Sequence, residues 1–549
     1  MNRPSALPAA LPAALPAILL ALTGLFSACK AQAPIIHSIH PQIGNMGEPI
    51  TIKGEGFGNE RSESYITIAG AQPISNSYLE WSDNEICFIS PVFGEAGLVY
   101  VCVNGIKSNG ALYANQAAVP VLAEENDTGQ GPRIISIAPD NGNIGTLLKI
   151  AGTGFGSSRG NSCVFFSCNY QMPASTPEDS IIQEYIEAAD LEFGYEMWSD
   201  KEIHIRIPDG AVSGNIGVRN AKGSSPPLFF EISRKPGVKT FKDKRIYTIS
   251  YLVNVKISEA EVSNTLYLWL PQPVISPSQR NLLLLSTNIQ PFIENYRGAR
   301  LYKFNDLQAG SELTVNLSMK VDSYSVETDL RYQTAIQEAS PIREIYTQSA
   351  ALLPSNDIRI KNKVSSIIGR ERNQYINAQK IYEWIINEDF IWEQNAGEDI
   401  FAVMETKHCD SYLAALLYCT LLRSAGIPSL PVAGVLIDSN RQAVNHYWAE
   451  FWIDGFGWVP VDPAIGAGAI PAFANIREDR AKYYFGNIDC QRIAFSRGLA
   501  ALSKMDPRGR VITHNRSYSL QNLWEEVVGG IEDYSSLWSG ITVTGIYSQ

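Results

Sequence analysis

The 549-residue sequence has no basic block long enough to follow a nucleic-acid backbone. Its 44 Lys and Arg residues are outnumbered by 56 Asp and Glu residues, so the formal net charge at pH 7 is −12. Binding to phosphates requires clustered positive charge, which this composition does not supply. We therefore expect no nucleic-acid partner.

Long apolar runs are also scarce, and only the first 29 residues contain one, "AILLALTGLFSAC". This run is too short to cross a bilayer as a mature helix, and it ends in small residues, as export signals do. "LFSAC" resembles a bacterial lipobox, with Phe26 where the tighter pattern has Leu. That resemblance implies a lipid on Cys29 and a protein anchored at the cell envelope. An ordinary signal peptide cut near "ACKAQA" is the alternative, and the protein would then be secreted.

The sequence also lacks a calcium-ligand loop, a nucleotide-binding motif and a cofactor site, so we expect no cofactor and no metal. Cysteines are few. The eight are Cys29, Cys87, Cys102, Cys163, Cys168, Cys409, Cys419 and Cys490. With Cys29 lipidated, seven remain, and at least one thiol is unpaired within a monomer. Cys87 with Cys102 is a candidate disulfide, and Cys163 with Cys168 form either a disulfide or two free thiols.

Two segments of the chain repeat. "PIIHSIHPQIGNMGEPITIKGEGFGNE" begins at Pro34 and "PRIISIAPDNGNIGTLLKIAGTGFGSS" at Pro132, an offset of 98 residues. "EWSDNEICFISP" and "MWSDKEIHIRIP" carry Trp81 and Trp198, an offset of 117, so the second copy holds an insertion of 117 − 98 = 19 residues. Short β-branched runs separated by glycine turns, with one tryptophan per unit, predict two small β-sandwiches.

These signatures resemble IPT/TIG domains, which are immunoglobulin-like modules, over residues 33–121 and 132–233. The resemblance implies a spacer or binding role for both units. From 237 to 330 the pattern remains β-like, because "RIYTISYLVNVKI" and "ELTVNLSMKVDSYSV" alternate apolar and polar residues. We expect a third β-sandwich there.

After residue 330 the sequence becomes helical in part. "NAQKIYEWIINEDF" places four apolar residues on one helical face, namely Ala378, Ile381, Tyr382 and Ile385. This change predicts an α+β domain over 340–500, followed by a C-terminal extension over 501–549. The expected protein is therefore a multidomain chain with three β-sandwiches and one α+β core.

A cysteine stands at the start of the most apolar predicted helix, in "KHCDSYLAALLYCTLLRSAGIPS". Leucines recur there at helical spacing and "RSAGIP" ends the helix at Gly426, so Cys409 lies at the helix N-terminus. Backbone N–H groups and the positive end of the helix dipole would stabilise a thiolate at that position. Cys409 is therefore a candidate nucleophile, although a buried structural cysteine is common at helix starts.

A nucleophile of this kind needs a base and a group that orients the base. "VNHYWAEFWIDGFGWVPVDP" predicts a β-hairpin that carries His446 and Asp462. If Ile453 pairs with Trp458, these two side chains point to opposite faces; if Ile453 pairs with Gly457, they share a face as diagonal neighbours. We therefore predict a three-residue loop or one bulge at Gly455 to Gly457, where glycine supplies the left-handed conformation.

The stretch from about Ala378 to Gly498 resembles the transglutaminase-like superfamily, which has a papain-like fold and a Cys-His-Asp triad. The matching elements are the cysteine at a helix start, "LLRSAGIPSLPVAGV" and "HYWAEFWIDGFGWVPVDP". The resemblance implies Cys409 as nucleophile, His446 as base and Asp462 as the orienting group. Lys407 is a departure, because the family usually has glycine two residues before the cysteine.

The resemblance implies a cysteine enzyme that acts on amide or peptide bonds of proteins or peptides through a thioester, and the N-terminal signal adds the expectation that it is exported. Water as the acceptor gives hydrolysis and an amine gives cross-linking, and the triad does not distinguish the two. The alternative is a non-catalytic surface adhesion or binding protein that keeps the fold.

Overall fold

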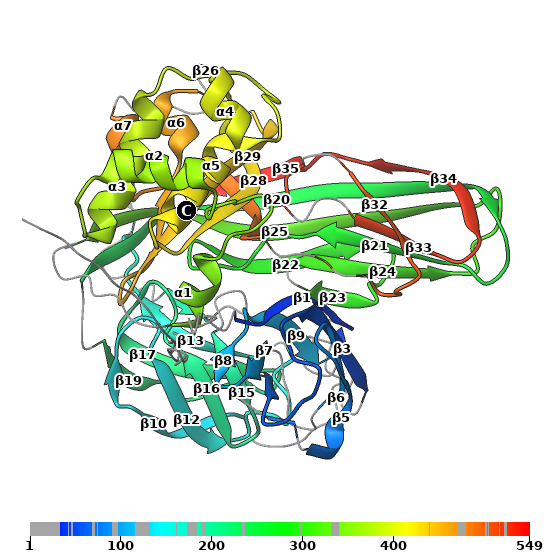
Figure 1. Cartoon of the computed structure of the whole chain (residues 1–549). Coiled ribbons are helices and arrows are strands. Elements are labelled where there is room, and N and C mark those ends of the chain that lie inside the picture. The colour runs from blue at the N-terminus through cyan, green and yellow to red at the C-terminus, as the bar shows by residue number, and fades with distance from the viewer. Residues whose placement is uncertain are drawn as a thin grey trace, which may run out of the picture.

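Figure 1 shows the computed structural model of the chain. The structure describes residues 33–548 apart from internal gaps, the longest of which are 91–96, 116–130, 173–183, 331–339 and 470–478. The expected export signal and Cys29 lie outside the described residues. Among the helices that are described, none is both long enough and apolar enough to cross a membrane.

The first repeat folds into two sheets around one core. One sheet has the order β1-β3-β6-β5 and the other the order β2-β9-β7-β4, with β8 paired to β7. Apolar residues of both sheets, such as Ile50 and Val101, meet in this core. The strands are β1 (Ile35–His40), β2 (Ile43–Gly44), β3 (Pro49–Glu55), β4 (Tyr65–Ile68), β5 (Tyr78–Trp81), β6 (Glu85–Ile89), β7 (Gly97–Val103), β8 (Ile106–Lys107) and β9 (Ala111–Asn115).

The second repeat has the same arrangement, with sheets ordered β10-β12-β16-β15 and β11-β19-β17-β13-β14. The indole N–H of Trp81 donates to Phe57 O, and that of Trp198 donates to Phe155 O, so each tryptophan ties its strand to the glycine-rich turn. The strands are β10 (Arg133–Ala138), β11 (Asn141–Gly142), β12 (Leu147–Thr153), β13 (Cys163–Cys168), β14 (Tyr185–Glu187), β15 (Tyr195–Trp198), β16 (Glu202–Arg206), β17 (Ala211–Asn220), β18 (Gly223–Ser224) and β19 (Leu228–Ile232).

The third β unit combines two distant parts of the chain. The C-terminal strands, expected as part of an extension after the core, pair with strands of the 237–330 segment: β34 and β35 with β20, and β33 with β21. These pairings cover strand edges that would otherwise be open to another chain. The strands are β20 (Gly237–Ala260), β21 (Thr265–Pro271), β22 (Gln279–Thr287), β23 (Ile293–Tyr296), β24 (Ala299–Asn305), β25 (Glu312–Leu330), β32 (Arg510–Thr513), β33 (Trp524–Val528), β34 (Ile531–Trp538) and β35 (Thr542–Ser548).

Helices α2 to α7 gather on one side of a four-stranded sheet with the order β30-β29-β28-β31, whereas α1 lies apart from them, next to the second repeat (Figure 1). The predicted apolar face of 378–385 is buried in α3, and α5 is buried along most of its length. The elements are α1 (Pro341–Tyr346), α2 (Ile358–Ile368), α3 (Gln374–Asn387), β26 (Ile391–Trp392), α4 (Ile400–Thr406), β27 (His408–Cys409), α5 (Ser411–Ser424), β28 (Ser429–Ile437), β29 (Ala443–Ile453), β30 (Gly457–Val461), α6 (Pro463–Ala467), α7 (Arg480–Tyr483) and β31 (Arg492–Arg497).

The two faces of this sheet pack against different parts of the molecule. Tyr447 and Ala449 of β29 belong to the core formed with α5, whereas Trp448 and Trp452 belong to a core shared with the second repeat, β20, β25 and α1. Ile144 of the second repeat also forms a β-bridge with Gly455 in the β29–β30 turn. The second repeat, expected as a spacer or binding module, is therefore packed directly on the hairpin.

The structure records all seven described cysteines as free thiols. Cys87 on β6 and Cys102 on β7, the candidate disulfide pair, lie in different sheets. Cys163 and Cys168 lie at the two ends of β13. For this second pair, the structure corresponds to the free-thiol alternative.

Candidate active site

The β29–β30 hairpin has the register that brings His446 and Asp462 together. Ile453 pairs with Gly457, which leaves a three-residue turn, and the pairing continues without a bulge to Ala449 and Val461. Gly455 and Gly457 adopt φ of 77° and 105°, where glycine is favoured. The predicted three-residue loop is confirmed. Gly457 has a second reason to be glycine, because a Cβ there would overlap Asp209 of the second repeat.

Asp462 lies between the end of β30 and the start of α6. Its Oδ1 accepts from the Ile465 N–H over 3.0 Å, so Asp462 is the N-cap, and Pro463 occupies the first turn. Proline is tolerated there because that N–H has no partner within the helix. The Asp-Pro pair in "VPVDP" therefore has a local structural reason, and the cap fixes the carboxylate at the end of the strand.

His446 and Asp462 form a buried hydrogen bond. The distance from His446 Nε2 to Asp462 Oδ2 is 2.7 Å, and the two side chains are 1% and 0% exposed. Burial opposes ionisation of the Asp462 carboxyl, but the charge and hydrogen bond of His446, with Arg492 and the Ile465 N–H, outweigh it and lower the pKa of Asp462 to about 2. Asp462 is therefore a carboxylate at neutral pH.

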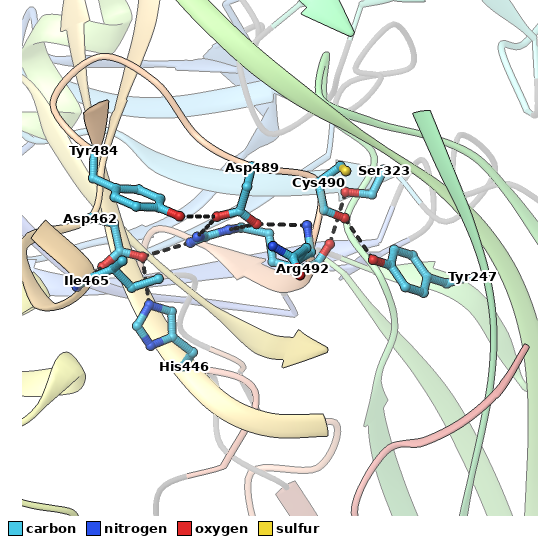
Figure 2. Close-up of polar contacts among 10 residues, drawn as sticks. Tyr247, Ser323, His446, Asp462, Ile465, Tyr484, Asp489, Cys490 and Arg492 are labelled. Atoms are coloured by element: carbon cyan, nitrogen blue, oxygen red, sulfur yellow. Dashed lines mark hydrogen bonds and ion pairs between the residues drawn. The ribbon is translucent and has the colours of Figure 1, made fainter. Parts of the chain in front are cut away.

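A further group of residues, which the sequence did not indicate, surrounds this pair (Figure 2). Arg492 Nη1 donates to Asp462 Oδ2 over 2.8 Å, and Arg492 Nη2 donates to Asp489 Oδ2 over 2.6 Å. The Tyr484 hydroxyl donates to the same oxygen of Asp489 over 2.9 Å. These three residues lie in "YYFGNIDCQRIAFSRG", where the Asp-x-x-Arg spacing is the only local signal.

Trp448 packs beside His446 on the same face of β29. The two rings are 6.2 Å apart between centroids and nearly parallel, at 19°. The guanidinium carbon of Arg492 lies 5.0 Å from the Trp448 ring centre. The alternation of His446, Trp448, Glu450 and Trp452 predicted from the sequence thus places His446 on the face opposite α5.

Cys409 sits immediately before α5 rather than in its first turn. It belongs to β27, which pairs in parallel with β26, and Asp410 is the N-cap, accepting from the Leu413 N–H over 2.9 Å. The Cys409 side chain is 0% exposed, and its Sγ donates to Asp410 O over 3.5 Å. Burial, and then the negative charge of Asp410, raise the pKa of the Cys409 thiol. The position therefore favours a neutral thiol, in contrast to the thiolate expected from the sequence.

The structure brings two of the three predicted residues together. In the described part of the chain, His446 Nδ1 is buried and has no hydrogen-bond partner. Tyr447, the neighbour of His446, is the residue that faces α5, and its ring lies 5.1 Å from that of Tyr412. The pairing of Cys409 with His446 stays a prediction.

The family comparison concerns the same segment. A family model of the transglutaminase-like superfamily matches residues 361–463, a range that contains Cys409, His446 and Asp462. The chain carries a transglutaminase-like domain. An IPT/TIG domain model matches residues 34–118, in the first repeat.

Individual proteins similar to this chain are distant. An uncharacterized protein of Haemophilus influenzae is 24% identical over 208 residues, which cover 32% of this chain and 54% of that protein. The chain thus spans about half the length of that curated relative. A solved structure named "Putative Cysteine Protease from Cytophaga hutchinsonii" is 14% identical, covers 55% of this chain and 92% of its own, and has a TM-score of 0.33. SGBP-B from a complex xyloglucan utilization locus in Bacteroides uniformis is 12% identical, with coverage of 54% and 99% and a TM-score of 0.12.

Lys407 of the transglutaminase-like domain occupies a backbone position that suits glycine. It is the C-cap of α4 and has φ of 66°, in the left-handed region. Its ammonium group pairs with Glu388 over 2.5 Å and lies 5.6 Å from the Phe390 ring centre. The usual family glycine therefore has a conformational reason, and the lysine side chain is directed toward Glu388.

No cluster of three potential metal ligands occurs among the described residues. His408, next to Cys409, pairs with Glu393 over 2.7 Å at a partly exposed site. Its side chain thus has a partner of its own, outside the predicted triad.

A small cavity of about 40 Å³ lies on the sheet face away from α5, where Trp448 and Asp489 line it. Arg492 lines it, together with two buried ion pairs, Arg497–Glu450 and Lys239–Asp209. A volume of this size holds roughly one to three water molecules. The cavity is therefore too small for a peptide.

Proposed function

We propose that the chain is a transglutaminase-like cysteine enzyme that acts on amide or peptide bonds of proteins or peptides. The observation that carries the proposal is the buried His446–Asp462 hydrogen bond within the matched family segment. One ring nitrogen of His446 is oriented by the carboxylate, and the other is buried without a partner. Such an imidazole is prepared to accept a proton from a thiol.

The proposed reaction begins at Cys409 Sγ. His446 Nδ1 accepts the thiol proton, and the sulfur attacks the carbonyl carbon of an amide. The C–N bond then breaks, the proton passes from His446 to the departing amine, and a thioester remains on Cys409. Water or a second amine attacks the thioester and restores the thiol. In the structure the thiol lies against Asp410, so the reaction requires the residues 407–410 to rearrange.

Alkylation kinetics test this proposal, with Cys419 as an internal control because it is also fully buried within α5. Iodoacetamide labelling is read by mass spectrometry in the mature chain, and amide cleavage is read by the release of amine from a protein substrate. We expect Cys409 to react faster than Cys419, His446→Gln to remove that difference, and Cys409→Ser to abolish amine release. Equal, slow labelling of both cysteines would contradict the proposal.

The closed environment of Cys409 favours a second candidate function, a non-catalytic binding protein. Its thiol is fully buried and has a raised pKa, and Tyr447 rather than His446 faces α5. In that case Cys409→Ser leaves the capture of a partner protein or peptide unchanged. Loss of capture together with loss of amine release in Cys409→Ser would exclude this second candidate.

We further propose that the protein is exported and anchored at the cell envelope through a lipid on Cys29. The proposal rests on the apolar leader and the "LFSAC" pattern. Metabolic labelling with a fatty-acid analogue, followed by membrane fractionation, tests it. We expect label in the membrane fraction for the wild-type chain and none for Cys29→Ser. A wild-type chain released to the medium without label would instead support an ordinary signal peptide.

A further inference from the structure

Arg492 lies behind the His446–Asp462 pair and donates to the same carboxylate oxygen as the histidine. We propose that Arg492 is a positioning residue, which holds Asp462 in the orientation that keeps the proton of His446 on Nε2. The proposal rests on the proposed function, because it gives Arg492 a role in the acid–base half of that reaction. The residues that carry it are shown in Figure 2.

Three donors from three elements hold the Asp462 carboxylate. His446 on β29 and Arg492 on β31 donate to Oδ2 over 2.7 and 2.8 Å, and the Ile465 N–H on α6 donates to Oδ1 over 3.0 Å. Rotation about the Asp462 side chain would break at least one of these bonds. Because the side chain is fully buried, water does not replace the lost donor, and the orientation is strongly preferred.

Arg492 is itself fixed by its surroundings. Its Nε and Nη2 point to Asp489 at 3.5 and 2.6 Å, while Nη1 reaches Asp462. The Trp448 ring packs against the guanidinium. The Tyr484 hydroxyl donates to Asp489, the second carboxylate that Arg492 contacts. The guanidinium therefore joins two carboxylates through different nitrogens of its fork of donors.

The segment that carries Asp489 and Arg492 is attached to the third β unit. The Tyr247 hydroxyl of β20 donates to Cys490 O over 2.9 Å, and the Ser323 hydroxyl of β25 donates to Arg492 O over 3.0 Å (Figure 2). The position of the guanidinium thus depends on strands outside the family-matched segment. Asp489 and Arg492 also lie outside that segment, so the family-matched residues alone do not contain the whole site.

The charges in this group also require Arg492. Two carboxylates, Asp462 and Asp489, lie close together in the interior, and burial alone would favour their neutral forms. The guanidinium lies between them, and the pKa values of both carboxyls are lowered despite burial. Removing Arg492 would leave two like charges without a common counter-ion.

The tautomer of His446 follows from the state of Asp462. An ionised carboxylate accepts hydrogen bonds and donates none, so Nε2 of a neutral His446 must carry the proton. Nδ1 then holds the lone pair, and this is the buried atom without a partner in the described structure. If Asp462 rotates or becomes neutral, the preference for the Nε2 proton weakens.

Lysine would not replace Arg492 in this role. A single ammonium group on a flexible stem does not offer the planar fork that reaches Asp462 and Asp489 at the same time. The chain provides a matched control in Arg497, which lies on the same strand, is equally buried and pairs with Glu450. Because the Arg497 guanidinium pairs with Glu450, replacing it perturbs the same strand and leaves the hydrogen bond between Arg492 and Asp462 in place.

Nitrogen NMR of the histidine ring tests the proposal without requiring activity. The full mature chain is labelled with ¹⁵N-histidine, and the His446 signals are those lost in His446→Gln. Two-bond ¹H–¹⁵N spectra, at a pH where the ring is neutral, identify the protonated nitrogen. The variants are Arg492→Lys, Arg492→Gln and Arg497→Lys, with Tyr484→Phe as a milder change that keeps the ring and removes the hydroxyl bonded to Asp489.

We expect the wild-type chain and Arg497→Lys to show the proton on Nε2. In Arg492→Lys and Arg492→Gln the tautomer with the proton on Nδ1 should rise at least about fivefold, corresponding to the loss of one charged hydrogen bond. With an amide substrate, we expect kcat to fall about 10- to 100-fold and KM to change little, because the tautomer affects proton transfer and not binding. If both Arg492 variants fail to fold, Tyr484→Phe should show a smaller shift in the same direction.

The outcomes separate this proposal from the proposed function. An unchanged tautomer in a folded Arg492 variant, or an unchanged tautomer in Tyr484→Phe when neither Arg492 variant folds, overturns the positioning role. A shift of equal size in Arg497→Lys also overturns it, because the effect would then be general loosening. A tautomer shift specific to Arg492, in a chain that cleaves no amide, supports the positioning role and contradicts the enzyme function.

Discussion

The two halves of the candidate site differ in how they are held. His446 and Asp462 are fixed by buried hydrogen bonds from three elements. Arg492, which donates to Asp462, is itself held by Asp489, and Asp489 accepts from the Tyr484 hydroxyl. Cys409 lies in a two-residue strand, its side chain is buried in the core around α5, and its thiol donates to the backbone oxygen of Asp410. The acid–base half of the site, His446 and Asp462, is thus pre-organised. The thiol half, Cys409, is buried and held by weaker contacts. The comparison teaches that the proposed activity depends on the segment around Cys409.

Asp462→Ala should be the most damaging change in the acid–base half. It leaves Arg492 and the His446 imidazole buried without a shared acceptor, and breaking such a buried pair costs about 3 to 5 kcal/mol of the free energy of unfolding. Hydrogen–deuterium exchange of β29 and α6 during urea unfolding measures the loss. A loss of less than about 1 kcal/mol in the free energy of unfolding would mean that the hydrogen bonds to Asp462 do not pre-organise the acid–base half.

Acid should weaken the acid–base half within a defined range. The pKa of Asp462 is lowered to about 2 in the folded chain from a usual value near 3.8, so the ionised form stabilises the fold above pH 4 and this contribution is lost as the pH falls toward 2. The shift corresponds to roughly 2 kcal/mol. Urea unfolding between pH 6 and pH 2 measures the stability difference between wild type and Asp462→Asn. We expect that difference to shrink over pH 4 to 2, and a constant difference would contradict the assignment.

Asp410→Ala addresses the thiol half. Loss of the N-cap of α5 should cost about 1 kcal/mol, and removal of the negative charge should lower the pKa of the Cys409 thiol. Alkylation of Cys409 at pH 8 should therefore become a few-fold faster. Asp399→Ala is the control, because Asp399 caps α4 in the same way and is not among the charges that affect Cys409. If Cys409 alkylation accelerates equally in both variants, the cause is a general loosening after loss of a helix cap and not the removal of the Asp410 charge.

Lys407→Gly, two residues before Cys409, also addresses the thiol half and should have the smallest effect on stability. Glycine removes the strain of a left-handed residue, worth about 1 kcal/mol, and the lost Glu388 pair at this partly exposed site offsets less than that. We expect a slight gain in thermal stability, measured by calorimetry. Glu388→Gln removes the pair alone and should cause a slight loss, so a loss in both variants would mean that the ion pair outweighs the strain.

Local patterns in the sequence were sufficient for several elements. The apolar spacing predicted the buried face of α3 and the extent of α5, because helix periodicity depends only on neighbours along the chain. The alternation of side chains between the two faces of a strand predicted the hairpin register, because only every second register places His446 and Asp462 on one face. The repeat predicted that the first two units are both small β structures with matching glycine and tryptophan positions, and the structure adds that they share a strand order.

Other features depend on contacts between distant residues. Arg492 and Asp489 have no signal of their own, because their role arises only when β31 lies beside β28 and next to the end of β30. The buried state of Cys409 also escaped the sequence, since a helix start predicts exposed N–H groups and does not show that Asp410 caps them. The third β unit required the C-terminal strands, which pair across more than two hundred residues.

The sequence by itself determined which residue types stand at the helix start, on the hairpin and at its end, because covalent order and local periodicity set those positions. The tertiary structure alone decided which of them meet. His446 and Asp462 face each other because of the hairpin register, and Arg492 joins them because the third β unit anchors its strand. The thiol of Cys409 is inaccessible to solvent because packing buries it, and Asp410, not Cys409, caps α5. Local sequence does not encode such contacts, since they depend on the path of the whole chain.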